Sequence, residues 1–202
     1  MPKALILIAD GSEEIEFVTP YDVLTRAGFE IQSAGVALKN DSYAHMTRNI
    51  RIVPDHHSLS FISNPSSYDI LILPGGAPGA KTFSSNDEVL QLIAAFRDQG
   101  KYVAAICAGT TALVAAQRLA ASGKTESGAG RKVKVTSHPS VKDEIKEAGW
   151  EYSEERVVVD EKIITSRGPG TAMLFALTIV ESLAGKGKRE EISSPLVVAE
   201  TL

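Results

Sequence analysis

Short apolar runs alternate with amphipathic segments along this chain. Five of the runs, rich in β-branched and other apolar residues, are predicted to be strands: 4–9, 30–36, 69–74, 102–106 and 133–137. The runs are apolar throughout rather than in alternation, which is typical of parallel strands covered on both faces. The pattern therefore favours a parallel sheet inside the fold.

The segments between and after these runs predict helices and one hairpin. Residues 86–100 carry an apolar helical face and begin with a good capping residue, Asn86. Residues 157–166 predict an antiparallel hairpin with its turn at 160–162, and residues 171–185 predict a strongly apolar helix.

This order of elements predicts the fold class. Alternation of strands and helices indicates an α/β doubly wound sandwich with a mostly parallel central sheet, followed here by the C-terminal hairpin and helix. The length suits one domain over residues 1–202, and residues 121–132 predict a polar surface loop. Ligands bind such sheets beyond the carboxyl ends of the strands, so the strand-to-helix turns are where chemistry is expected.

Composition narrows the classes of function. Apolar residues make up 44% of the chain and charged residues 23%, with a formal net charge of −4, so the chain is globular. The absence of a basic stripe with aromatic residues argues against a nucleic-acid partner. A single cysteine argues against a disulfide-stapled secreted protein, and no apolar run is long enough for a membrane span. We expect a cytoplasmic protein, with the nucleus as a second compartment.

The only cysteine, Cys107, occupies one of the turns. It follows the strand 102–106 and precedes a helix-forming segment, with the small residues Ala105 and Gly109 two positions away on either side. Such a sharp elbow presents a nucleophile at a helix N-terminus, where unpaired N–H groups lower a thiol pKa. The alternative is a buried thiol that only packs, because free cysteines are often buried.

Three further turns carry polar or small residues. Gly75 and Gly76 follow the strand 69–74 and let backbone N–H groups approach a ligand, although an ordinary tight turn is the alternative. No Gly-Lys-Ser/Thr follows, which excludes a phosphate-binding P-loop. His138 follows the strand 133–137 and is a candidate base or orienting group.

The first turn contains three glutamates. Glu13 and Glu14 fit the usual role of acidic residues that complement a helix dipole, whereas Glu16, between Ile15 and Phe17, is a candidate for pointing into a crevice. The histidines at 45, 56 and 57 have no cysteine partner, and we expect no structural zinc there.

Taken together, the turns resemble one family. The segments "GSEEIEFVTPYDVL", "ILPGGAPGA", "AAICAGTTALVA", "TSHPSVKD" and "TSRGPGTAMLFALTIVE" resemble, in order and spacing, the Parkinson-disease-associated DJ-one branch of the ThiJ/PfpI superfamily. The resemblance covers nearly the whole chain. It implies a flavodoxin-like α/β sandwich and a homodimer.

The resemblance also implies roles for individual residues. Cys107 would be the nucleophile, Glu16 the carboxyl group hydrogen-bonded to its sulfur, and His138 a nearby third member. Gly76 and Ala108 would supply oxyanion N–H groups. Arg26 and Arg48 match arginines that lie near the subunit interface and the site.

Departures from the related branches bear on the chemistry. Thr110 stands where the family often has proline, so a looser start of the following helix is expected; Val53 replaces a second cysteine of some relatives. Protease-like branches carry histidine directly after the cysteine, where this chain has Ala108, and His138 is not part of the His-x-Glu pair that class I glutaminases need. Amide hydrolysis is therefore disfavoured.

The function that we expect is a cofactor-free, glutathione-independent glyoxalase. Cys107 would attack the aldehyde of methylglyoxal or glyoxal, and Glu16 or His138 would move a proton between the carbons, giving lactate or glycolate. Neither a metal nor a nicotinamide is expected. The alternative is a redox sensor or chaperone in which Cys107 is oxidised to a sulfinic acid beside a protonated Glu16.

Overall fold

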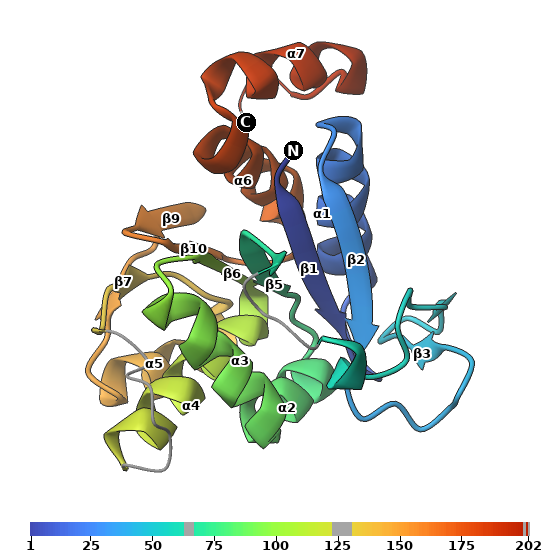
Figure 1. Ribbon diagram of the computed structural model, residues 1–202. Coiled ribbons are helices and arrows are strands. Elements are labelled where there is room, and N and C mark those ends of the chain that lie inside the picture. The colour runs from blue at the N-terminus through green and yellow to red at the C-terminus, as the bar shows by residue number, and fades with distance from the viewer. Residues whose placement is uncertain (63–66, 123–130, 200, 202) are drawn as a thin grey trace.

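The computed structural model describes residues 1–62, 67–122, 131–199 and 201 of the chain. A six-stranded sheet forms its centre, in the order β2-β1-β5-β6-β10-β9 (Figure 1). Its strands are β1 (Lys3–Ile8), β2 (Glu30–Gly35), β5 (Ile70–Leu73), β6 (Tyr102–Ile106), β9 (Val157–Asp160) and β10 (Ile163–Ser166). Four neighbouring pairs are parallel and only β9 with β10 is antiparallel, so the predicted parallel sheet with an added hairpin is confirmed.

The predicted strand at 133–137 is the exception. Only Lys134–Val135 (β7) is extended, and it pairs with β8 (Glu151–Tyr152) in a separate two-stranded sheet. The place beside β6 that an additional parallel strand would take is held by β10 of the hairpin. A further short pair joins β3 (Ala44–His45) to β4 (Arg51–Ile52), which the apolar pattern does not predict because each strand has two residues.

Seven helices are described, together with one-turn 3₁₀ helices. They are α1 (Glu14–Arg26), α2 (Ala77–Ser85), α3 (Asp87–Asp98), α4 (Thr110–Ala121), α5 (Lys142–Glu147), α6 (Ala172–Ala184) and α7 (Lys186–Leu196). The 3₁₀ turns are Leu59–Phe61, Cys107–Gly109, Pro139–Val141 and Pro169–Thr171.

The two helices predicted from the pattern are confirmed. The side chain of Asn86 accepts a hydrogen bond from the Val89 N–H at 3.1 Å, which caps α3 as expected. Gly185, with φ of 87°, follows the last residue of α6. The predicted loop at 121–132 lies mainly in 123–130, outside the described residues.

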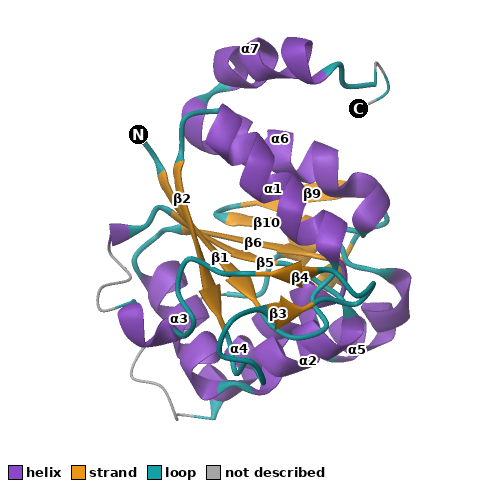
Figure 2. Cartoon of the chain, turned by 90° about the vertical axis from the view of Figure 1, so that its right-hand side faces the viewer, coloured by secondary structure: helices purple, strands orange, loops and turns teal. Residues whose placement is uncertain are grey.

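Helices cover both faces of the sheet. Along β1 the side chains alternate between two hydrophobic clusters, with Leu5 and Leu7 on one face and Ile6 and Ile8 on the other. The first cluster includes residues of α3 and α4, and the second includes residues of α1 and α6 (Figure 2). This is the doubly wound α/β arrangement, and it brings the carboxyl ends of β1, β5 and β6 to one edge of the sheet.

Candidate active site

Cys107 lies at the elbow between β6 and α4. Its backbone has φ of 63°, a left-handed conformation that non-glycine residues rarely adopt and that often marks a functional turn. The elbow needs small neighbours because it packs on the end of β5: a Cβ on Gly109 would lie 2.6 Å from the carbonyl oxygen of Pro74. The thiol is 8% exposed, and the backbone N–H groups of Gly76 and Ala108 are directed at it.

Glu16 lies in the first turn of α1, directly beneath the elbow. Its side chain is fully buried, and Oε2 accepts a hydrogen bond from the Gly75 N–H at 2.8 Å. Oε1 has no hydrogen-bond partner of good geometry among the described residues. Glu13 caps the helix by accepting the Glu16 N–H through Oε2 at 2.9 Å, which fixes the backbone from which the buried carboxyl projects.

Gly75 explains how close the thiol and the carboxyl are. A Cβ added to Gly75 would lie 2.6 Å from Cβ of Cys107 and 2.6 Å from Oε2 of Glu16. The two side chains therefore converge on one side of this glycine, with room for no further atom. The Gly75 N–H donates to Glu16 and is therefore not free to face a ligand, contrary to the expectation from the sequence. The backbone N–H groups of Gly76 and Ala108 remain as candidate donors to a bound substrate.

The pair is electrostatically coupled. Burial raises the pKa of Glu16 to about 7, and the neighbouring Cys107 thiol and the hydrogen bond from the Gly75 N–H oppose this rise. Burial also raises the pKa of Cys107 to about 12, with the negative charge of Glu16 as the second cause and the amides of Ala108 and Gly76 opposing it.

The expectation that a helix N-terminus alone gives Cys107 a low pKa is therefore wrong. The amides are present, but burial and an ionised Glu16 outweigh them. When Glu16 is protonated, its charge is gone and its carboxyl can donate a hydrogen bond to the sulfur, which favours the thiolate. The loss of the first proton belongs to the pair of Cys107 and Glu16 as a whole, so the protonation state of one group decides that of the other.

A cavity of about 430 Å³ opens above the thiol. It is lined by Glu13, Thr47, Arg48, Gly76, Ala77, Pro78, Cys107, Ala108, His138, Ser140 and Pro169. Five residues singled out from the sequence thus meet at one cavity, while Glu16 and Gly75 lie behind its wall. Two hollows of similar volume, about 480 and 470 Å³, lie along α1 and β2, and Cys107 lines neither of them. The cavity of about 430 Å³ is therefore the candidate active site, because it contains the thiol.

The two arginines are separated by the structure. Arg48 lines the cavity, whereas Arg26 lies in the last turn of α1, at the other end of the helix from Glu16. Its guanidinium forms an exposed ion pair with Asp22 at 2.7 Å. Arg26 therefore does not reach the cavity within this chain.

The sequence does not predict how the wall of the cavity formed by Thr47 and Arg48 is held in place. Glu14, for which the sequence indicates only a role as a helix-dipole complement, is 5% exposed and accepts hydrogen bonds from the Thr47 hydroxyl at 2.8 Å and from the Arg48 N–H. These contacts hold the β3–β4 turn against the start of α1. Sequence reasoning missed them because the turn is short and polar and lies more than thirty residues from Glu14.

Thr110 also differs from the expectation of a loose helix start. Its side chain is fully buried, and its hydroxyl donates to the carbonyl oxygen of Thr136 at 3.1 Å. The contact ties the first residue of α4 to the segment that leads to His138. The helix start is therefore bound to a neighbouring segment rather than loosened.

The described part of the chain holds neither a cluster of metal ligands nor a helix that could span a membrane. Within those ranges, no three His, Cys, Asp or Glu side chains group closely enough to hold a metal ion. None of the helices described there has the length and apolar character to cross a membrane.

Comparison with known proteins agrees with this geometry. Residues 2–182 match the model of the DJ-1/PfpI family. The chain is 39% identical to the Parkinson disease protein 7 homolog of Danio rerio, over 98% of each chain. It is 37% identical to the glutathione-independent glyoxalase DJ-1 of Schizosaccharomyces pombe, over 97% of this chain and 98% of that one. The solved structure of Schizosaccharomyces pombe DJ-1 superposes with a TM-score of 0.85 at 35% identity, covering 98% of this chain and 100% of that one. The chain therefore belongs to the DJ-1/PfpI family.

Proposed function

We propose that this protein is a glutathione-independent glyoxalase that converts methylglyoxal to lactate and glyoxal to glycolate. The observation that carries the proposal is the buried pair of Cys107 and Glu16 below a small cavity, with two backbone amides directed at the sulfur. The name of the Schizosaccharomyces pombe relative, a glutathione-independent glyoxalase, supports the same activity.

The first step is addition of the thiol to the aldehyde. Glu16 takes the proton of the Cys107 thiol as the sulfur forms a C–S bond with the aldehyde carbon, and the electron pair of the carbonyl moves to oxygen. Glu16, which is protonated when the sulfur is charged, gives its proton to that oxygen. The products are a neutral hemithioacetal and an ionised Glu16, with the amides of Gly76 and Ala108 placed to stabilise the developing negative charge.

The second step moves hydrogen between the two carbons. The ionised Glu16 takes the proton from the carbon bonded to sulfur, giving an enediolate, and returns it to the neighbouring carbon, while the hydroxyl proton on the first carbon moves to the oxygen of the second. The first carbon is oxidised to a thioester and the second is reduced to an alcohol. Because the oxidation and the reduction balance within the substrate, the step needs no external electron carrier.

The last step is hydrolysis. Glu16 takes a proton from a water molecule that attacks the thioester, and the C–S bond breaks to release the acid and the thiolate. Glu16 then returns its proton to the sulfur, so the pair starts and ends each turnover with one proton. The pKa of about 7 for Glu16 suits a group that both gives and takes a proton near neutral pH.

The test is lactate formation from methylglyoxal with no glutathione present. We expect Cys107→Ser to abolish it, because a serine hydroxyl is a far poorer nucleophile at neutral pH. Glu16→Gln should be severely impaired, since an amide cannot relay the proton. His138→Ala should be intermediate. Glu88→Gln, the same change at an exposed first-turn glutamate of α3, is the matched control and should leave the rate unchanged.

Activity that survives in Cys107→Ser would reject the covalent route. Protein deglycase activity, the deglycation of amines or thiols modified by these aldehydes, would use the same chemistry on an aminocarbinol or a hemithioacetal. It would be assigned to the enzyme only if it exceeds the rate at which free aldehyde is removed.

A redox role for the same thiol is the second candidate. A protonated Glu16 beside the sulfur would donate a hydrogen bond to a sulfinate, formed when two molecules of hydrogen peroxide in turn each transfer one oxygen atom to Cys107 and leave as water. Glu16→Gln keeps a donor and Glu16→Leu removes it. Mass spectrometry after peroxide treatment should therefore show sulfinate that persists in Glu16→Gln and is over-oxidised in Glu16→Leu.

We also propose that the chain is a single domain that forms a homodimer in the cytoplasm. Val18 on α1 and Val53 after β4 are 48% and 70% exposed and line one hollow, so a second copy would cover them. Val53→Glu should give monomers in sedimentation, whereas Phe61→Glu, at another exposed apolar side chain, should not. A reducing compartment such as the cytoplasm keeps the thiol available.

A further inference from the structure

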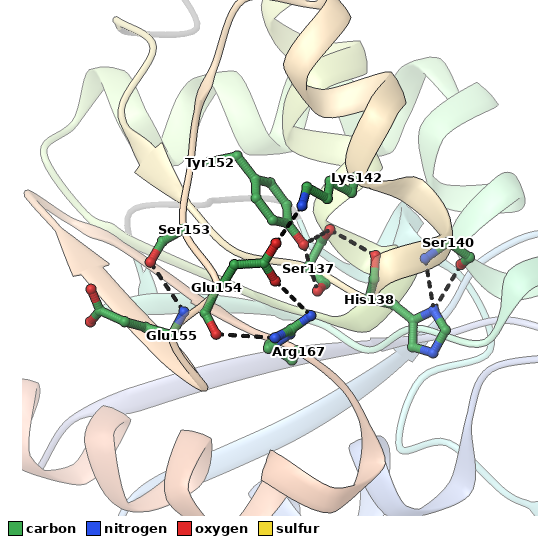
Figure 3. A network of polar contacts seen from close by, with 9 residues as sticks. All are labelled: Ser137, His138, Ser140, Lys142, Tyr152, Ser153, Glu154, Glu155 and Arg167. Carbon is green, nitrogen blue, oxygen red and sulfur yellow. Dashed lines mark hydrogen bonds and ion pairs between the residues drawn. The ribbon is translucent and has the colours of Figure 1, made fainter.

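The imidazole of His138 is held in one orientation by its own turn. Nδ1 lies 3.2 Å from the backbone nitrogen of Ser140 and 2.8 Å from the Ser140 hydroxyl (Figure 3). A backbone N–H can only donate, so Nδ1 has to be the acceptor. In the neutral ring the proton then lies on Nε2, because a neutral imidazole carries only one.

The backbone on both sides of His138 is fixed as well. The Ser137 hydroxyl donates to the carbonyl oxygen of His138 at 3.0 Å, and the Tyr152 hydroxyl donates to the carbonyl oxygen of Ser137 at 3.1 Å (Figure 3). Ser137 is fully buried. The contact between Nδ1 and Ser140 is therefore part of an ordered segment, and a ring flip would lose it.

Charged groups near this segment are already engaged with one another. Glu154 pairs with Arg167 at 2.9 Å and with Lys142, and the Lys142 ammonium lies 5.4 Å from the centre of the Tyr152 ring (Figure 3). The ring partners of His138 among the described residues are the two groups of Ser140, and no carboxylate contacts Nδ1 there. A carboxylate at that position would favour the opposite tautomer, with the proton on Nδ1.

We infer that His138 serves the cavity as an Nε2–H hydrogen-bond donor and not as a proton acceptor. Nδ1 is occupied by the Ser140 N–H, and Nε2 already carries the proton, so the neutral ring has no free lone pair to take a proton from a substrate carbon. For the catalytic part this rests on the proposed function: the Nε2–H would donate to an oxygen of the bound dicarbonyl as negative charge develops on it. Glu16 is then the group that moves the carbon-bound proton.

The tautomer can be read without any activity. We propose ¹⁵N–¹H correlation spectra of the full-length protein with labelled histidine, in which His138 is assigned by the loss of its signals in His138→Asn. The expected result is a protonated Nε2 and an unprotonated Nδ1. A protonated Nδ1 with a free Nε2 would overturn the inference, whether or not the protein makes lactate.

A pair of variants separates the donor from the base in catalysis. Glutamine places an N–H donor near the position of Nε2, whereas asparagine places its acceptor near Nδ1 and can keep the cap on Ser140 without a donor at the position of Nε2. We expect lactate formation by His138→Gln to exceed that by His138→Asn by about tenfold or more, since loss of one such donor costs about 100-fold.

Two outcomes of this experiment count against the inference. Equal loss in His138→Gln and His138→Asn would mean that a proton acceptor is required. A pH profile that loses one limb only in the His138 variants would mean the same, because a donor that does not titrate in the reaction should change the height of the profile and not its shape. If the wild-type protein makes no lactate, the proposed function fails, and the tautomer from the spectra alone decides the inference.

Discussion

Glu14 and Glu16 lie two residues apart in the first turn of α1, and the structure shifts their pKa values in opposite directions. Both are buried, at 5% and 0% exposure, and burial alone would raise both. Hydrogen bonds from Thr47 and from backbone N–H groups outweigh burial at Glu14, and its pKa lies below the usual value. Glu16 has fewer donors, and burial raises its pKa to about 7. One turn of helix thus holds a structural carboxylate and a carboxyl group able to exchange protons.

The raised pKa of Glu16 has a consequence for stability. A carboxyl group whose pKa rises on folding, here from 4.5 to about 7, binds its proton more tightly in the folded state. Stability from this source is complete below the unfolded value and is lost as the pH rises through the folded value. Glu16→Gln stays neutral, so its free energy of unfolding relative to wild type should increase by up to about 3 kcal/mol between about pH 5 and pH 8.

Urea unfolding at several pH values, followed by fluorescence, measures this difference. The same comparison in a Cys107→Ser background removes the thiol from the titration and assigns the effect to the carboxyl group. Parallel pH dependence in wild type and Glu16→Gln would show that the carboxyl is ionised at little cost in the folded protein.

Glu14 should behave in the opposite way. Its carboxylate accepts hydrogen bonds from the Thr47 hydroxyl and the Arg48 N–H, one on each oxygen. The side-chain amide of glutamine has a single oxygen, so it can accept from one of these donors, and its NH₂ group would face the other. We expect Glu14→Gln to lose about 1–3 kcal/mol of stability at neutral pH. Because the folded pKa is lowered, this contribution is present above the unfolded value of 4.5 and is lost as the pH falls through the folded value.

The measurement is thermal unfolding of wild type and Glu14→Gln over the acidic range, with the exposed Glu88→Gln as the control. The gap between Glu14→Gln and wild type should start to close as the pH falls below the unfolded value of 4.5 and close further as the pH passes through the lower folded value. A gap that stays constant in acid would indicate that the shape of the side chain, and not its charge, holds the turn.

Local signals account for the parts of the molecule that the sequence predicts. The apolar runs of β1, β5 and β6 are strands because each is covered on both faces, and the cap at Asn86 acts within its own turn. The elbow at Cys107 can be predicted from the sequence because the close packing there requires small residues within a few positions of the cysteine. Each of these features depends on residues within a few positions of one another.

The parts that the sequence does not predict depend on contacts between distant segments. The Gly75 N–H meets Glu16 across 59 positions, and this single contact decides which glycine can face a ligand. The sign of the Cys107 pKa shift depends on burial and on that same glutamate, neither of which the elbow motif contains. The run at 133–137 has the composition of a central strand, but β10 pairs with β6 instead.

Thr110 offers a test of one such contact. Valine has the same shape as threonine, so Thr110→Val removes the hydrogen bond to the Thr136 carbonyl and leaves the packing intact. We expect a loss of about 1–3 kcal/mol, because the site is fully buried and the carbonyl loses its donor. Thr178→Val is the matched control: its hydroxyl bonds the Leu174 carbonyl inside α6, which the helix already satisfies. Chemical unfolding that shows equal losses in the two variants would mean that the link between α4 and the His138 segment contributes nothing.

The close packing around Gly75 predicts the effect of one added methyl group. A Cβ at position 75 would stand 2.6 Å from Cβ of Cys107 and from Oε2 of Glu16, and 3.0 Å from the Ala108 nitrogen. Backbone conformation is not the obstacle, because Gly75 does not have a positive φ. Gly75→Ala must therefore push the thiol and the carboxyl apart, and the Ala108 amide with them. We expect lactate formation to fall by about 100-fold or more, since displacement of catalytic groups by about an ångström has effects of this size.

Gly187→Ala in α7 is the control, because no heavy atom lies within 4 Å of its added Cβ. That change should raise stability slightly, as alanine is the better helix former, and should leave lactate formation unaltered. The alkylation rate of Cys107, the only thiol, reports the same displacement independently of substrate. Lactate formation and alkylation that both match wild type in Gly75→Ala would show that the pair tolerates separation, and the coupling of Cys107 with Glu16 would then not be what drives the chemistry.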